Sequence, residues 1–116
     1  KAAAQNDAMA QYNLASMYDN GEVVDEDKAK ALEWYVKAAY GGHKESPNYI
    51  GILYDNGEGA PEDDIAAYAW WLIGIKRGDN APQNNMDYLA KKLTPEQLSK
   101  AKLLSAKLEA DMATKK

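Results

Sequence analysis

A 36-residue internal repeat constrains the fold of this chain more than any other feature of its sequence. When the sequence is shifted by 36 positions, 13 residues between 1 and 42 fall on identical residues, where chance would give about three. The longest match lays Tyr18-Asp19-Asn20-Gly21-Glu22 on Tyr54-Asp55-Asn56-Gly57-Glu58. A repeat of this length predicts a stack of similar units, each of which buries its apolar face against the next.

Each unit is predicted to be two helices joined by a glycine turn, because apolar residues recur at three and four positions and stop where Gly appears. Gly21 suits the left-handed conformation that ends a helix, and the acidic residues 25–27 suit the start of the next one. The stripes predicted to be buried in the first unit are Ala10, Leu14, Met17 and Tyr18, then Ala31, Trp34, Tyr35 and Ala38.

The repeat divides the chain, which we treat as a single repeat domain over residues 1–116. We assign 1–6 to the end of a preceding repeat, 7–42 to repeat 1, 43–78 to repeat 2, 79–93 to a degenerate repeat helix and 94–116 to a capping helix. The first helix of repeat 2 is expected to begin late, at Ser46-Pro47, and Thr94-Pro95-Glu96-Gln97 is a capping box. The predicted fold class is all-α, a right-handed alpha-alpha superhelix (solenoid) of 36-residue helix-turn-helix repeats with a C-terminal capping helix.

The composition fits such a domain, with 46% hydrophobic and 28% charged residues. No apolar run approaches the roughly 20 residues that a membrane-spanning helix needs, so membrane insertion is not expected. The net charge of -4 argues against a nucleic-acid partner, which would require an excess of Lys and Arg. The absence of Cys excludes disulfides and thiolate metal sites, and it leaves a cytoplasmic or a periplasmic location open.

Two clusters of acidic residues are the strongest candidates for chemistry: Glu22, Asp25, Glu26 and Asp27, and Asp55, Glu58, Glu62, Asp63 and Asp64. A carboxylate pair of this kind is used in glycoside hydrolysis. Because the clusters recur at the repeat offset, we interpret them as turns and helix starts. Neither cluster has the ligand spacing of a calcium-binding loop. We therefore predict no catalytic residue, no metal and no cofactor.

The single histidine and the tryptophans also have structural interpretations. His43 follows Gly42 at a helix junction, and we expect it to be exposed to solvent rather than to act as a general base. Trp34 and Trp70 occupy equivalent positions in the two repeats, which favours a place in the core over a sugar-stacking platform. The same expectation is weaker for Trp71.

These residues also resemble a known family. Tyr12-Asn13-Leu14, Met17-Tyr18, Trp34-Tyr35 and Lys37-Ala38-Ala39 followed by Gly42 are similar to the Sel1-like repeat, a relative of the tetratricopeptide repeat. The segments Ala67-Tyr68-Ala69-Trp70 and Leu93-Thr94-Pro95-Glu96-Gln97-Leu98 resemble the closing repeat of bacterial members. The family prefers Gly where Ala15 and Val23 stand, and a helix residue where Pro47 stands. The resemblance implies an adaptor that binds proteins or peptides and carries over no catalytic residue.

The predicted binding surface is the concave face made by the first helix of each repeat. We call it the A-helix strip, which comprises Met9, Asn13, Ser16 and Asn20, then Tyr49, Ile52 and Asn56, then Asn85 and Tyr88. We expect an exposed groove of apolar and amide groups that suits an extended peptide, with Asn13 beside Tyr49 and Ser16 beside Ile52. The alternative is a hydrolase or carbohydrate-binding module that uses the clustered carboxylates on the same solenoid. Self-association through the N-terminal repeat face is a further possibility.

Overall fold

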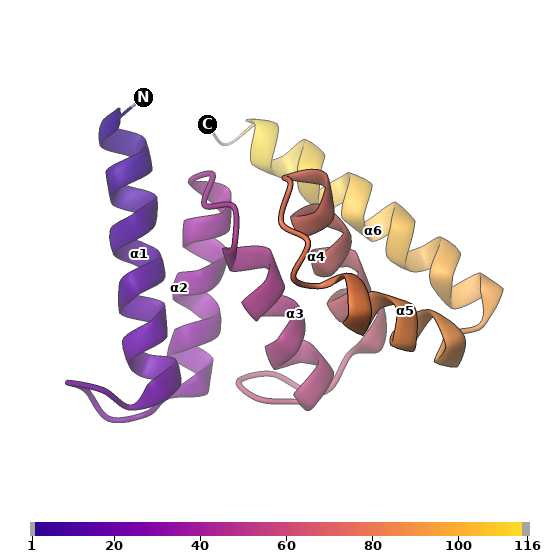
Figure 1. Cartoon of the computed structure of the whole chain (residues 1–116), viewed down its shortest axis with the longest axis horizontal. Helices are drawn as coiled ribbons and strands as arrows, with labels where there is room; N and C mark the ends of the chain where they lie inside the picture. Colours follow the sequence, from indigo (N-terminus) through magenta and orange to yellow (C-terminus); the bar gives the residue numbers. More distant parts are fainter. Residues whose placement is uncertain (1, 115–116) are drawn as a thin grey trace.

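The computed structural model describes the backbone of residues 2–114 and the side chains of residues 7–114. It contains helices α1 (Ala2–Asn20), α2 (Lys28–Tyr40), α3 (Ser46–Asn56), α4 (Asp64–Lys76), α5 (Gln83–Lys92) and α6 (Pro95–Thr114). The first four helices form two antiparallel pairs that stand side by side, α1 with α2 and α3 with α4 (Figure 1). The described residues contain no strand, so the chain is an all-α solenoid of helical repeats, as the sequence predicts.

The two helix pairs repeat with the period found in the sequence. Helices α2 and α4 begin 36 positions apart and end 36 positions apart, and α1 and α3 also end at this offset. Asp27 and Asp63 precede α2 and α4 with extended backbones, and their carboxylates accept hydrogen bonds from the backbone N–H groups of Lys30 and Ala66. The acidic helix starts expected from the sequence are therefore N-caps, which satisfy otherwise free amides.

The turn between the helices of a pair depends on left-handed backbone positions. Gly21 and Gly57 end α1 and α3 with φ of 71° and 68°, as expected for glycines that follow a helix. Two residues later the repeats differ, because Gly59 has φ of 79° whereas Val23 adopts φ of 72° with a β-branched side chain. Val23 is the only residue other than Gly with positive φ in the described part of the chain. Repeat 1 therefore carries a local conformational strain that repeat 2 lacks.

Helices α1 and α3, the first helices of the two repeats, begin at different positions of the repeat. Helix α3 begins at Ser46 with Pro47 in its first turn, which confirms the late start expected from the sequence. Helix α1 begins at Ala2 and runs without a break into repeat 1. The assignment of residues 1–6 to a preceding repeat stays a prediction, and Lys1 lies outside the described residues.

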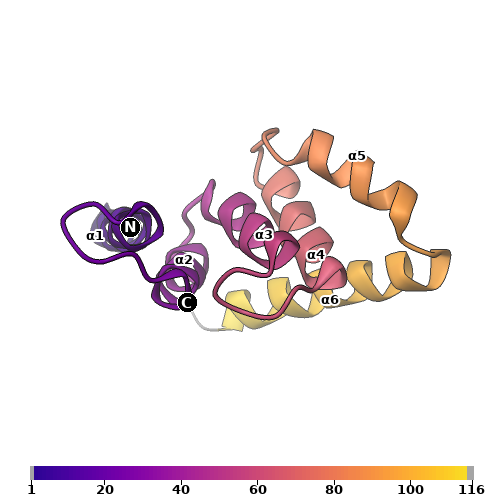
Figure 2. The same cartoon turned by 90° about the horizontal axis from the view of Figure 1, so that it is seen from below.

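Helix α6 begins with the capping box expected from the sequence. Thr94 and Gln97 exchange two hydrogen bonds, from Gln97 N–H to Thr94 Oγ1 at 3.1 Å and from Thr94 N–H to Gln97 Oε1 at 2.9 Å, so the capping box is confirmed. The helix then runs along α4 on the side opposite α5 (Figure 2). Near its end, Asp111 accepts a hydrogen bond from the Tyr40 hydroxyl of α2. Helix α6 thus contacts both α2 and α4.

The core consists of two apolar clusters. The first joins α1, α2, α3 and α4, with Met112 of α6 at its edge, and the second joins α4 to α5 and Leu93. Trp70 and Trp71 are buried, with exposed fractions of 4% and 1%. Trp34 is only partly buried, which corrects the expectation that it lies in the core. The Lys37 ammonium lies over its ring, 4.2 Å from the ring centre, so a flexible cation covers part of its surface.

The buried face of α1 also differs from the predicted stripe. Ala8 and Ala15 are buried, whereas Ala10 is exposed. Because α1 packs mainly on α2, small residues at the contact let the two backbones approach closely. Gly41 at the end of α2 illustrates this approach, since a Cβ there would lie 3.0 Å from the Ala8 Cβ.

Candidate interaction surface

Most of the A-helix strip lies on the surface. Exposed members are Met9, Asn13 and Asn20 on α1, Asn56 on α3, and Asn85 and Tyr88 on α5. Met9 and Tyr88 are large apolar or aromatic groups with 50% and 68% of their area exposed. Ser16 is partly buried and accepts a hydrogen bond from the Asn20 side-chain amide at 3.3 Å. The strip therefore offers amides and two apolar groups to a partner.

Tyr49 and Ile52 are not freely exposed, which corrects the groove expected from the sequence. The Tyr49 ring stacks on Tyr35 with centroids 5.3 Å apart and tilts against Tyr12 at 5.7 Å. Ile52 packs against the second core cluster, which also contains Met86 of α5. Both residues lie on the sides of α3 that contact neighbouring helices, and these contacts explain why they are less exposed than expected.

These contacts decide which parts of the strip come together. The Tyr12 and Tyr49 rings connect α1 to α3, so the residue that faces Tyr49 is Tyr12 rather than the expected Asn13. Ile52 joins α3 to the cluster that contains α5. Helices α1, α3 and α5 lie along one side of the array in Figure 2. Met9 lines a cavity together with Ala8 and residues 41–45.

A charged network that joins α1 and α2 was not predicted from the sequence. The Lys28 ammonium and the Tyr35 hydroxyl, both on α2, donate to the carboxylate of Asp19 on α1. Burial, followed by the charge and hydrogen bond of Asp19, raises the pKa of Tyr35 well above its usual range. The hydrogen bond from Lys28 to Asp19 raises the pKa of that ammonium. Both groups thus keep their protons and hold the first repeat together.

The 36-residue offset gave no signal for this network. It carries Asp19, Lys28 and Tyr35 to Asp55, Asp64 and Trp71, so the second repeat keeps one acid and replaces both donors. Trp71 donates instead to a backbone carbonyl, that of Asn48, at 3.0 Å. The two repeats therefore hold their helix pairs together with different hydrogen bonds.

His43 is buried, with 9% of its area exposed, so the expectation of a solvent-exposed histidine is wrong. Its ring stacks on Tyr12 with centroids 4.2 Å apart, and its Nδ1 accepts a hydrogen bond from the Ser46 backbone N–H at 3.1 Å. The Arg77 guanidinium donates to the His43 carbonyl at 3.0 Å. Burial lowers the pKa of His43, and the charge of Arg77 lowers it further against the opposing effect of Glu45. A neutral imidazole therefore caps the start of α3.

The same histidine invites comparison with a hydrolytic triad. Ser46 Oγ lies 2.8 Å from His43 Nδ1, and Glu45 Oε1 lies 3.6 Å from Nε2. Nucleophilic catalysis requires a serine oxygen that a substrate carbonyl can reach. Ser46 has no exposed area, and the Nδ1 that would act as base also accepts the Ser46 backbone N–H. The arrangement is a local turn that starts a helix.

Residues of the two acidic clusters cap helices or lie exposed in turns. Asp27 and Asp63 cap helices, and Glu22, Asp25 and Glu62 are exposed in the turns. Among the described side chains, no group of three or more His, Cys, Asp or Glu residues is arranged to hold a metal ion. Within the described part of the chain, no helix combines the length and apolar character needed to cross a membrane.

The two helix pairs, which recur at a 36-residue offset, place the chain among the all-helical repeat proteins. Within this class, the family model described as Sel1 repeat matches residues 8–43 and 48–79, and the chain belongs to this family. No curated protein matches the chain.

One solved structure has the same fold over most of this chain. It is c5321, described as a protective antigen present in uropathogenic Escherichia coli strains and displaying an SLR fold, with a TM-score of 0.76 and 29% sequence identity. The similarity covers 93% of this chain and 23% of that protein. The chain therefore spans about a quarter of the length of this relative.

Proposed function

We propose that this chain is a non-catalytic repeat scaffold that binds an extended segment of a partner protein along the A-helix strip. The observation that carries the proposal is the exposure of Tyr88, Met9 and the strip amides on successive A helices. Amides bond to a peptide backbone, and exposed aromatic groups hold apolar side chains. The Sel1 repeat match supports a scaffold of this type.

Peptide selection from a random displayed library, followed by affinity measurement with synthetic peptides, tests the proposal. Replacing Tyr88 by Ala is expected to weaken binding of the selected peptides at least about fivefold, because aromatic anchors contribute 1 kcal/mol or more. Leu103→Ala is the matched control, since Leu103 is a comparably exposed apolar residue on α6, away from the strip. Selected peptides that bind Tyr88→Ala and Asn13→Lys as tightly as the unmodified chain would place the surface elsewhere.

Tyr49 and Ile52 are unsuitable for this test, although sequence reasoning points to them. Tyr49 contacts two core rings and Ile52 contacts the second cluster, so Ala substitutions there remove core contacts as well as strip surface. Tyr88 and Asn13 avoid this ambiguity because both are exposed.

The alternative of a hydrolase or carbohydrate-binding module receives no comparable support. Two of its candidate carboxylates cap helices, and the partly exposed Trp34 ring is covered by the Lys37 ammonium. Purified chain is expected to show no turnover of glycoside and ester probes. Turnover that a single carboxylate substitution abolishes would restore this alternative.

Self-association through α1 stays a proposal, and the repeat interface limits its geometry. A Cβ on Gly59 would lie 2.4 Å from the Lys28 carbonyl oxygen, so the loop after α3 packs directly on the backbone of α2. Val23 stands at the equivalent position after α1, and it is exposed. The second helix of a repeat in another copy cannot approach α1 in the geometry that α2 and α3 adopt without striking the Val23 side chain. Any dimer formed through α1, detectable by sedimentation velocity, would therefore use another register.

A further inference from the structure

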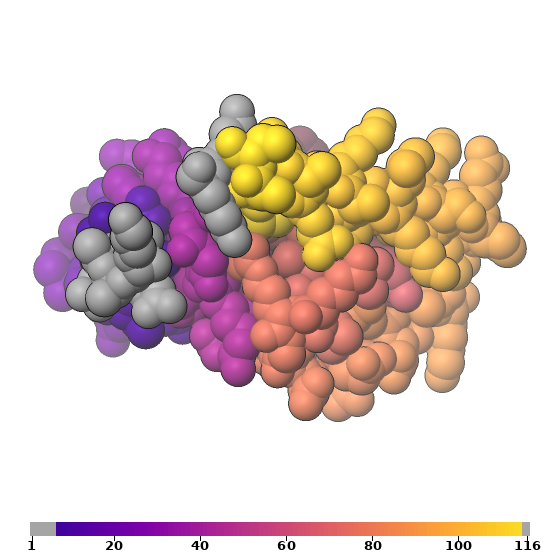
Figure 3. Space-filling view, turned by 90° about the horizontal axis from the view of Figure 1, so that it is seen from above, coloured from indigo at the N-terminus to yellow at the C-terminus, as the bar shows by residue number. Residues whose placement is uncertain are grey.

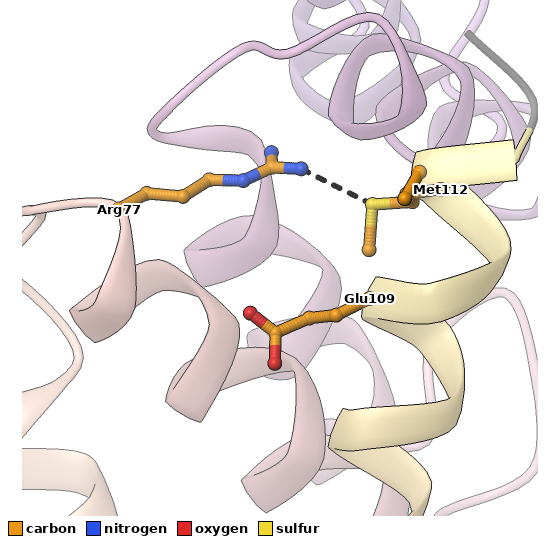
Figure 4. A pocket seen from close by; sticks show the side chains of 4 residues that line it. Arg77, Glu109 and Met112 are labelled. Atoms are coloured by element: carbon orange, nitrogen blue, oxygen red, sulfur yellow. Dashed lines mark hydrogen bonds between the residues drawn. The ribbon is translucent and has the colours of Figure 1, made fainter.

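Arg77 is the only arginine of the sequence, and it lies where three parts of the fold meet. It caps the C-terminus of α4, and its Nη1 donates to the His43 carbonyl of the α2–α3 connection at 3.0 Å. Its Nη2 points across to α6, 3.1 Å from the sulfur of Met112 (Figure 4). The side chain is partly buried, and this burial lowers its pKa.

The guanidinium is poorly satisfied for a partly buried cation. It has five N–H donors, of which one bonds to a carbonyl and another to a thioether, a weak acceptor. No carboxylate within residues 7–114 lies within ion-pair distance of it, and the nearby Glu109 pairs instead with Lys76 at 3.0 Å. Partly buried charges are ordinarily paired, because desolvation without a counter-ion is costly. Glu109 acts on this cation only from beyond ion-pair distance, so an anion that enters beside the guanidinium would complete its hydrogen bonds.

A cavity adjoins this guanidinium. It has a volume of about 180 Å³ and is lined by Arg77, Glu109, Met112 and Ala113. Figure 3 shows the last turns of α6, in yellow, beside the connection that follows α4. In Figure 4 the guanidinium and the Glu109 carboxylate border the space from opposite sides, with Met112 between them. The space exceeds the roughly 30 Å³ that one water molecule occupies in the liquid, so a small group fits.

We propose that this cavity binds a carboxylate group of a partner chain, held by Arg77. A planar guanidinium binds a planar carboxylate through two parallel hydrogen bonds, and Met112 and Ala113 would contact the carbon atoms next to it. Glu109 is paired with Lys76, which lies outside the cavity lining, so the charge of Arg77 remains and the site favours a single negative charge. Glu109 in the wall disfavours the double charge of a phosphate.

The carboxylate site is separate from the A-helix strip, because its lining comes from α6 and the C-terminus of α4. It does not depend on the peptide-binding proposal. The experiment below uses acetate and needs no identified partner, so either proposal can fail without the other.

The single arginine provides the test, because its Nε–Hε group gives one signal in the side-chain region of a nitrogen–proton NMR spectrum. Titration with sodium acetate at constant ionic strength is expected to shift this signal to saturation, together with the backbone amide of Ala113. Sodium chloride and neutral acetamide are the controls and should leave it in place. A linear response, or an equal response to acetamide or chloride, would overturn the proposal.

Two variants separate binding from a merely structural role of Arg77. Glu109→Gln removes the wall carboxylate, and the loss of this repulsion is expected to tighten acetate binding about threefold by Coulomb's law across several ångströms of water-exposed space. Arg77→Lys, which keeps the charge and loses the fork, is expected to weaken it about tenfold, read from the Ala113 amide. If Arg77 serves only to attach α6, Glu109→Gln leaves the acetate response unchanged, and the proposal falls.

The source of the carboxylate is decided with short peptides. N-acetylglycine mimics a chain terminus, and N-acetylaspartate amide mimics an acidic side chain. The source that the partner uses is expected to shift the Arg77 signal at lower concentration than the other. Failure of both compounds to shift it would contradict the proposal even if acetate binds.

Discussion

The indole of Trp71 lies directly on the backbone of Gly51, so that a Cβ at this glycine would be 2.2 Å from the indole Nε1. The same nitrogen donates to the Asn48 carbonyl, which fixes the ring across α3. The equivalent pair in repeat 1 is Ala15 and Tyr35, and both are fully buried. Repeat 2 thus combines the larger ring, Trp71, with Gly51, and repeat 1 combines the smaller ring, Tyr35, with Ala15.

Gly51→Ala is therefore expected to destabilise the chain by about 1–3 kcal/mol. Overpacking in a close-packed core costs about 1–3 kcal/mol, and loss of the Trp71 hydrogen bond adds about 1 kcal/mol. The better helix propensity of Ala offsets about 1 kcal/mol of this loss. Urea denaturation monitored by circular dichroism measures the change.

The double variant Gly51→Ala/Trp71→Tyr recreates the pair found in repeat 1 and serves as the control. The loss of stability in the double variant is expected to be smaller than the sum of the two single losses by about 1 kcal/mol or more, because residues in contact are coupled. Additive effects would show that the two side chains do not compete for the same space.

Local signals allowed the fold to be predicted from the sequence. The N-caps Asp27 and Asp63 and the glycine Gly21 act within a few residues of their own helix, so their patterns identify helix ends without knowledge of the packing. The 36-residue offset then gave the stacking order. Each of these features depends on short-range geometry that the sequence carries directly.

The environment of single side chains could not be predicted in the same way. His43 follows a glycine pair that suggests exposure, yet its ring is covered by Tyr12 of the preceding helix and its carbonyl is bonded by Arg77, 34 residues later. Tyr49 and Ile52 were placed on the correct helix, but helical periodicity does not say which neighbour covers an edge. Such contacts depend on how the helices pack.

Val23→Gly is expected to stabilise the chain by about 0.5–1.5 kcal/mol. Val23 is 92% exposed and holds φ of 72°, so its side chain contributes little packing while its backbone carries the left-handed cost of about 1–2 kcal/mol. The greater freedom of Gly in the unfolded chain opposes part of the gain. The midpoint of thermal unfolding is expected to rise.

Val24→Gly is the matched control in the same turn. Val24 is partly buried and has no positive φ, so Gly there loses packing and gains unfolded-state freedom without relieving strain. This control is expected to lower stability. Equal effects of the two substitutions would mean that the left-handed conformation of Val23 is not the source of the gain.

Replacing each tryptophan by Ala should cost more stability for the buried Trp71 than for the partly buried Trp34. Trp71→Ala is expected to cost about 3–5 kcal/mol, because the ring is fully buried and its removal leaves a cavity. Trp34→Ala should cost about 1–2 kcal/mol, since its partly buried ring loses less apolar contact and one cation–π interaction. Chemical denaturation of both variants gives the comparison, and equal costs would place Trp34 in the core after all.

His43 is expected to make stability fall at mildly acidic pH. Burial lowers its pKa below the value of about 6.5 found in an unfolded chain, with Arg77 adding to the effect and Glu45 opposing it. Above this pH the imidazole is neutral in both states, and its contribution is complete. As the pH falls below about 6.5 the unfolded chain binds a proton that the folded chain resists, so unfolding is favoured until the folded-state pKa is reached.

The variant His43→Asn isolates this effect from the titration of the carboxylates. Asn does not titrate in this range, and its side-chain oxygen can accept the Ser46 backbone N–H as an N-cap does. Urea denaturation between pH 7.5 and 5 is expected to show a steeper loss of stability in the unmodified chain than in the variant, whatever the absolute stability of each. Parallel pH profiles would show that His43 takes up its proton equally well in the folded and unfolded states, contrary to its burial against Tyr12.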